Sequence, residues 1–100
     1  MELVEEVYKI TRNLPASEKY GLASQMQRAA VSMPSNIAEG FKRQHRAEFR
    51  QSLAIASGSA AEVETQLHLV KRLYRTIAVD RGLSLVDEVN RMLFVLIKRL

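Results

Sequence analysis

Polar side chains recur every three or four positions from Gln25 to Glu39, so a helix would place them on one face. A shorter row of the same kind runs from Ser59 to Gln66. The residues are Gln25, Arg28, Ser32, Asn36 and Glu39 in the first row, and Ser59, Glu62 and Gln66 in the second. These rows could line a ligand or catalytic site, or they could form a structural polar network that fixes the register of two helices. Because no nucleophile–base pair accompanies them, we interpret them as a structural network in which Arg28 pairs with Glu39 or Glu62. The members of this predicted network are Gln25, Arg28, Asn36, Glu39, Ser59 and Glu62.

The carboxylates and histidines do not form a metal-binding pattern. A carboxylate-bridged metal site in a helical bundle needs several glutamates and paired Glu-x-x-His motifs. Here Glu64 and His68 are four positions apart, and Glu62 has no histidine partner. The chain has no cysteine, and it contains no phosphate-binding loop, dinucleotide-binding glycine motif or histidine-rich zinc motif. We therefore expect no catalytic, cofactor or metal site, and a protein that is not an enzyme.

Two groups of cations lie around the two ends of the helix expected over residues 46–75. The first contains Lys42, Arg43, Arg46 and Arg50, and the second contains Lys71, Arg72 and Arg75. Cations at the end of a helix stabilise it through the helix dipole, which accounts for all of them except Arg46 and Arg50. These two lie in the first turns of a helix, where the dipole disfavours cations, so phosphate binding explains them better. We expect both groups to bind nucleic acid, without sequence-specific stacking because no aromatic platform accompanies them.

Apolar residues recur at alternating steps of three and four, which indicates helices along the whole chain. The expected helices cover about residues 3–14, 17–41, 46–75 and 84–100. Ser17 and Ser84 are the expected N-caps, residues 80–82 an expected turn, and Pro34 an expected kink. Short connections make neighbouring helices antiparallel. We therefore predict an all-α fold, an up-down antiparallel four-helix bundle with a shortened first helix, that forms a single domain over residues 1–100.

Charged residues are scarce in two stretches of this bundle. Over residues 20–41 only Arg28 and Glu39 are charged, and residues 53–61 carry no charge at all. A surface helix should show charges along one face, so these stretches are expected to be covered on more than one side. Self-association supplies that cover most simply. Small side chains would let the backbone of a partner approach closely at Ala54, Ser57, Gly58 and Ala61.

The composition favours a cytoplasmic globular protein. Hydrophobic residues make up 47% of the chain, and no apolar run approaches the roughly 20 residues needed to cross a bilayer. The N-terminus is acidic where a signal peptide would be basic, and the absence of cysteine fits a reducing compartment. We expect no membrane partner. The net charge of +4 permits an anionic partner and serves solubility equally well.

Several runs of residues carry a family resemblance. The most specific are Ser-x-x-x-Asn-Ile-Ala-Glu-Gly over 32–40 and Ile-Ala-x-Gly-Ser over 55–59, with further matches at Tyr20-Gly21-Leu22, Gln25, Arg28-Ala29-Ala30, Phe49 and Glu62. Over nearly its whole length the chain resembles the S23-like four-helix bundle family encoded in intervening sequences of bacterial 23S ribosomal RNA genes. The fold is also similar to that of the accessory variability proteins of diversity-generating retroelements.

The resemblance implies a homopentamer of four-helix protomers. Its retroelement relatives bind nucleic acid and a reverse transcriptase through basic surfaces, so RNA, DNA and a reverse transcriptase are the implied partners. Relative to the family, the first helix is shortened at its start. Two functions follow as hypotheses. One is a non-catalytic oligomer that binds nucleic acid and is associated with ribosomal RNA or a retroelement. The other is a protein-interaction or structural scaffold whose basic ends balance helix dipoles and aid solubility.

Overall fold

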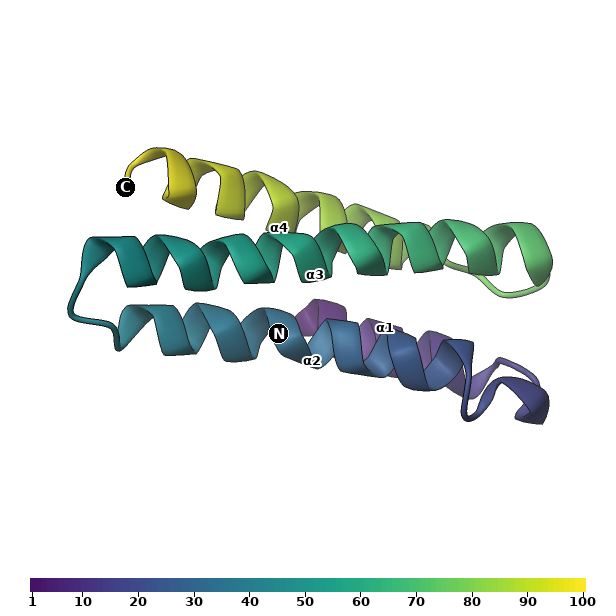
Figure 1. The fold of residues 1–100 in the computed structure, drawn as a ribbon. Coiled ribbons are helices and arrows are strands. Elements are labelled where there is room, and N and C mark those ends of the chain that lie inside the picture. Colours follow the sequence, from purple (N-terminus) through teal and green to yellow (C-terminus); the bar gives the residue numbers. More distant parts are fainter.

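Four α-helices and one 3-10 helix make up the chain, and the computed structural model describes residues 1–100. They are α1 (Glu2–Arg12), η1 (Ala16–Glu18), α2 (Leu22–Phe41), α3 (Arg46–Leu73) and α4 (Asp80–Lys98). The longest helix, α3, contacts both α2 and α4, while α1 packs against α2 and α4. Figure 1 shows α3 running back along α2, and α4 running back along α3. The predicted all-α class is confirmed, because the chain contains no strand.

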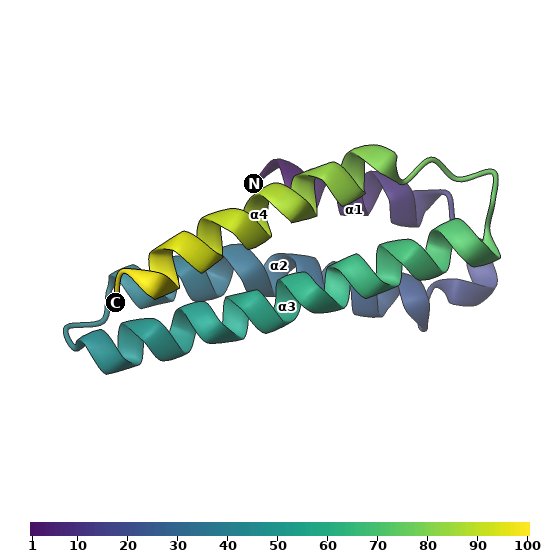
Figure 2. The same cartoon turned by 90° about the horizontal axis from the view of Figure 1, so that it is seen from above.

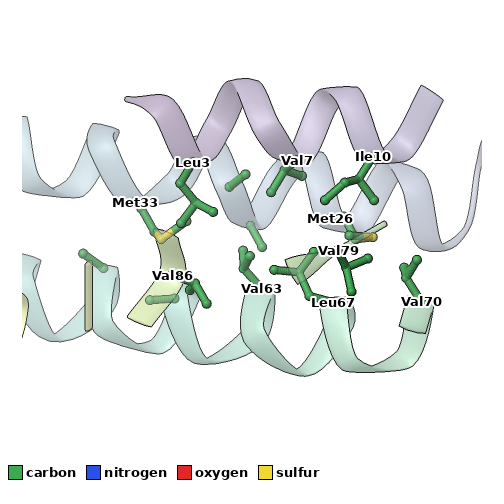
Figure 3. Close-up of a cluster of buried hydrophobic side chains, with 14 of the residues drawn as sticks. Leu3, Val7, Ile10, Met26, Met33, Val63, Leu67, Val70, Val79 and Val86 are labelled. Atoms are coloured by element: carbon green, nitrogen blue, oxygen red, sulfur yellow. The ribbon is translucent and has the colours of Figure 1, made fainter. Parts of the chain in front are cut away.

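One apolar core receives side chains from all four helices. In the first helix and just after it, the apolar residues at steps of three and four are all buried: Leu3, Val7, Ile10 and Leu14. Burial of an aliphatic side chain of this kind contributes roughly 1.5–3 kcal/mol. Figure 3 shows residues of the core that point toward one another from different helices: Leu3, Val7, Ile10, Met26, Met33, Val63, Leu67, Val70 and Val86.

The first helix covers only part of the length of the bundle. α1 has 11 residues, whereas α2 has 20, α3 has 28 and α4 has 19. In both views the N-terminus lies partway along the long helices, and α1 extends from there toward the α3–α4 connection (Figures 1 and 2). At the other end of the bundle Phe41, Met92 and Val95 are exposed. The chain therefore leaves apolar side chains of α2 and α4 uncovered.

The second helix begins later than predicted, and Ser17 does not cap it. Ser17 lies in η1, and α2 begins at Leu22 with Gly21 in the N-cap position. The Leu22 amide donates instead to Glu18 Oε1 at 3.4 Å. A carboxylate in this place also interacts favourably with the N-terminal end of the helix dipole. Glu18 follows Ser17 directly, and its longer side chain reaches the first amide of α2.

The fourth helix begins earlier than predicted. Residues 80–82 are not a turn, and Ser84 is not an N-cap, because α4 starts at Asp80. The connection is formed instead by residues 74–79. Gly82 is buried inside the helix, where a Cβ atom would lie 3.1 Å from Ile10 Cδ1 and 3.3 Å from Leu67 Cδ1. This glycine allows α4 to approach α1 and α3 closely, so it serves packing where we had predicted a turn.

Pro34 lies inside α2, which is helical without interruption from Leu22 to Phe41. Side chains in the same segment donate to carbonyl oxygens of the preceding turn: Ser35 Oγ to Val31 O at 2.9 Å, and Asn36 Nδ2 to Ser32 O at 2.8 Å. The kink expected at Pro34 stays a prediction. None of the helices is both long and apolar enough to pass through a membrane.

Candidate nucleic-acid interface and polar seam

The first basic cluster consists of Lys42, Arg43, Arg46 and Arg50, and all four residues are exposed. Arg43 forms an ion pair with Glu39 one turn before it. Arg46 is the first residue of α3 and Arg50 lies one turn further, and neither forms an ion pair. Arg46 therefore stands unpaired in the first turn, where the dipole disfavours a cation, and Arg50 stands unpaired at the start of the second turn.

Two further cations lie at this end of the bundle and were not among the predicted binding residues. Lys98 ends α4 and Arg99 follows it. The C-terminal part of α4 lies beside the start of α3 in both ribbon views (Figures 1 and 2). Nothing in the local sequence places residues 98 and 99 near residues 46 and 50. Only the antiparallel course of α4 along α3 brings them together.

The second basic cluster, Lys71, Arg72 and Arg75, lies at the opposite end of α3 and is exposed. Lys71 Nζ is 3.6 Å from Asp80 Oδ1, a surface ion pair of the kind that contributes about 0–1 kcal/mol. Arg72 and Arg75 have no ion-pair partner. All three residues line a shallow surface hollow together with Thr65, His68 and Leu69.

The second cluster is held in place by a hydrogen bond between distant segments. Tyr74 follows α3, and its hydroxyl donates to Glu18 Oε2 at 2.5 Å. The hydrogen bond to Glu18 raises the pKa of Tyr74 above its usual value of 10.0, and desolvation and the negative charge of Glu18 act in the same direction. The contact fixes η1 beside the end of α3, so Lys19 and Arg75 belong to the same end of the bundle.

The predicted polar rows of α2 and α3 meet where Ser32 and Asn36 of α2 lie against Ser59 of α3, and we call this contact the polar seam. Ser59 Oγ of α3 donates to Ser32 Oγ of α2 at 2.9 Å, and Asn36 Nδ2 donates to the same Ser32 oxygen at 3.0 Å. Further along α3, Gln66 Nε2 donates to Glu62 Oε2 at 3.3 Å. Gln66 is buried, and its Oε1 atom has no hydrogen-bond partner. The seam thus links α2 and α3 through one hydrogen bond between two hydroxyl groups, and the amide side chains form hydrogen bonds within their own helix.

The ion pairs predicted for Arg28 are not formed. Glu39 pairs with Arg43 instead, because residues 28 and 39 are about 16 Å apart along a helix that rises 1.5 Å per residue. Glu62 accepts only from Gln66. Arg28 is exposed, and it lines an open hollow between α2 and α3 with Gln25, Ala29, Ser32, Ser59 and Glu62. The structure therefore brings most of the predicted network together and separates Glu39 from it.

Comparison with known proteins places this geometry in a family. A solved structure with 27% sequence identity, a protein of unknown function from the S23 ribosomal protein family of Bacteroides thetaiotaomicron, superposes with a TM-score of 0.76. The match covers 95% of this chain and 88% of that one. No curated protein matches the chain. Residues 1–95 match the family described as 23S rRNA-intervening sequence protein. The chain belongs to the 23S rRNA-intervening sequence protein family.

Proposed function

We propose that this protein is a non-catalytic oligomer that binds nucleic acid through its two basic clusters. The observation that carries the proposal is the pair Arg46 and Arg50, exposed and without ion-pair partners in the first turns of α3. A cation in the first turn of a helix is disfavoured by about 0.3–1 kcal/mol at an exposed site. Binding of phosphate groups offsets that cost, because each neutralised phosphate releases condensed counterions.

The surroundings of the pair support a polyanionic partner. Lys98 and Arg99 enlarge the first cluster, and the second cluster adds Arg72 and Arg75 at the far end of α3. Contacts of this type read the phosphate backbone, so we expect little preference for sequence. The family takes its description from the 23S rRNA intervening sequence, which makes RNA the first nucleic acid to test. A retroelement association, with DNA and a reverse transcriptase as partners, is the second form of this proposal.

Exposed apolar side chains support self-association. Val31 of α2 is 42% exposed and Ile55 of α3 is 49% exposed, and on α4 Met92 and Val95 are 44% and 45% exposed. Two different apolar surfaces suit a heterologous contact, in which one surface of each copy packs on the other surface of the next. Such contacts form a ring when the rotation from one copy to the next closes. We propose a cytoplasmic homopentamer, built from up-down antiparallel bundles that bend at Pro34.

The same apolar side chains favour a second candidate, a protein-interaction scaffold that binds no nucleic acid. In that case the basic clusters balance helix dipoles and aid solubility. The two candidates differ in one measurement, the binding of RNA and DNA across a salt series. For a nucleic-acid-binding protein, the logarithm of the binding constant falls linearly as the logarithm of the salt concentration rises. The scaffold shows no binding to RNA or DNA at any salt concentration.

A charge-reversal variant tests the two residues on which the proposal depends, Arg46 and Arg50. Arg46→Glu combined with Arg50→Glu should weaken binding to all sequences alike and flatten the salt slope by roughly one unit per lost phosphate contact. The matched control is Arg28→Glu combined with Arg91→Glu, which makes the same change in net charge at exposed helical positions outside both clusters. If both double variants bind alike, net charge alone drives binding and the first cluster is not the site.

A further inference from the structure

Seven exposed residues form one stripe along α3, which we call the outer stripe. They are Arg50, Ala54, Gly58, Ala61, Thr65, His68 and Arg72. Successive members are three or four positions apart, so they lie on the same face of the helix. Between Arg50 and His68 the stripe carries no charge and no side chain larger than threonine. The middle of the stripe therefore has only small, uncharged side chains, and the charged members of the stripe lie at its two ends.

The cations at the two ends are available for a ligand. Neither Arg50 nor Arg72 forms an ion pair, and each has further cations beside it, Arg46 at one end and Arg75 at the other. A ligand that satisfies both ends must carry negative charge at two places along the helix. It must also tolerate a neutral stretch between them.

The distance between the ends matches a repeat in double-stranded nucleic acid. Arg50 and Arg72 are 22 positions apart, which is about 33 Å along a helix that rises 1.5 Å per residue. One turn of a B-form DNA duplex measures about 34–36 Å, and the phosphates of one strand that face the same side recur once in each turn. We propose that the outer stripe of α3 lies along a nucleic-acid duplex, with the two basic ends contacting phosphates one helical turn apart. This inference rests on the proposed nucleic-acid binding, and it names the duplex as the ligand.

The small side chains in the middle of the stripe permit this arrangement. A Cβ atom added at Gly58 would meet nothing within 4 Å, so this part of α3 is open to an approaching backbone. Ala54 and Ala61, one turn to either side, are also exposed and add only methyl groups. A long side chain in the middle would hold the duplex away from both arginines. The small residues thus let the two ends act on one ligand.

Charge disfavours a symmetric contact between the outer stripes of two copies. A second copy packed stripe to stripe would set arginines opposite arginines in either orientation, and like charges repel. Sequence-tolerant single-strand binding commonly uses aromatic side chains on which bases stack. The outer stripe contains no aromatic residue. A duplex needs only regularly spaced cations.

A length series of duplexes tests the proposal with the full chain at low salt. RNA and DNA duplexes of about 8, 12, 16 and 24 base pairs, and single strands of equal length, serve as probes. Affinity should rise steeply between about 8 and 12 base pairs, because only the longer duplexes span both ends. Arg72→Glu should weaken binding of the 16-base-pair duplex by about tenfold or more and that of the 8-base-pair duplex by about twofold.

A matched pair of variants tests the middle of the stripe. Ala61→Glu places a longer, negative side chain under the duplex and should weaken binding by about tenfold or more. Ala38→Glu makes the same change at an exposed position of α2 and should have a small effect. Circular dichroism and molar mass should be unchanged for both variants.

The outcomes separate this inference from the proposed function. Binding without a length threshold, or equal binding of single strands and duplexes, overturns the inference and leaves nucleic-acid binding intact. A lower molar mass of Ala61→Glu shows that another copy covers the stripe, which also overturns the inference. If neither RNA nor DNA binds at low salt, the proposed function fails together with it.

Discussion

The Tyr74 hydroxyl donates a hydrogen bond to Glu18 Oε2 at 2.5 Å, and this bond joins the end of α3 to the segment that precedes α2. The other carboxylate oxygen of Glu18 accepts from the Leu22 amide at 3.4 Å. One side chain therefore serves the start of α2 and the end of α3 at once. Its position holds η1 against the end of the bundle that carries the second basic cluster.

Tyr74→Phe should lower stability at neutral pH and reduce the loss of stability in alkali. The pKa of Tyr74 is raised above 10.0 in the folded protein, so the folded state holds the proton more tightly than the unfolded state. The contribution of this group is complete below its unfolded pKa, and it is lost as the pH rises through its higher folded pKa. Urea unfolding between about pH 8 and pH 11 should show a steeper loss for the wild type than for Tyr74→Phe.

Tyr20→Phe is the control for this experiment. Tyr20 is 89% exposed and its hydroxyl forms no hydrogen bond within the protein, so its removal should leave stability and its pH dependence unchanged. Equal pH profiles for Tyr74→Phe and the wild type would mean that the bond to Glu18 does not persist in solution.

Alanine substitutions at Gly58 and Gly40 should change the stability of the protein in opposite directions. Gly58→Ala should stabilise the protein by about 0.5–1 kcal/mol, because Gly58 is helical and exposed and its new methyl group meets no atom. At Gly40 the new Cβ atom would lie 2.9 Å from Phe49 Cδ1 and 3.2 Å from Ser52 Cβ. Gly40→Ala should therefore destabilise by about 1 kcal/mol or more, since the overpacking exceeds the gain in helix propensity.

Chemical denaturation of both variants at the same protein concentration measures this difference. The comparison has an internal control, since the substitution is the same and both positions are helical. Two stabilising substitutions would show that α2 and α3 are further apart at residues 40 and 49 than in this structure.

The helices themselves follow from the sequence because their apolar periodicity is long and regular. In α3 the apolar residues at steps of three and four are buried: Leu53, Ala56, Ala60, Val63, Leu67 and Val70. The ends of the helices were harder to predict from the sequence. Gly82 resembles a turn residue, but its environment in space gives it a packing role. Ser17 and Ser84 are good caps by type, and tertiary contacts placed the helix starts elsewhere.

The sequence predicted only those parts of the candidate site whose residues are close together along the chain. Each basic cluster occupies a short stretch of sequence around one end of α3, so both could be named from the sequence. Lys98 and Arg99 could not, because their approach to the start of α3 depends on how α4 packs. The Arg28 ion pairs were wrong for a related reason. Helical spacing put Arg28 and Glu39 in one row, but it did not weigh the nearer partner Arg43.

The polar seam should contribute a measurable coupling between α2 and α3. Ser32→Ala removes the oxygen that accepts from both Ser59 and Asn36, and it should destabilise by about 1–2 kcal/mol. Ser59→Ala should cost less, since it removes one of those donors. A double-mutant cycle of these two variants should give a coupling of about 0.5–1 kcal/mol. Additive effects would mean that the two hydroxyls do not interact.

The exposed apolar surfaces of α3 and α4 should respond to a charge that is placed on either of them. Ile55 is 49% exposed on α3 and Val95 is 45% exposed on α4, and we expect contacts with another copy to cover both. Ile55→Glu and Val95→Glu should each lower the molar mass measured by light scattering at micromolar protein, because each buries a charge in one side of the same heterologous contact. Glutamate at the matched position Leu69, which is 43% exposed beside the second basic cluster, should leave the mass unchanged. Helical content should stay constant in all three variants, since these side chains lie outside the core. A wild-type protein with the mass of a single chain would contradict the proposed ring.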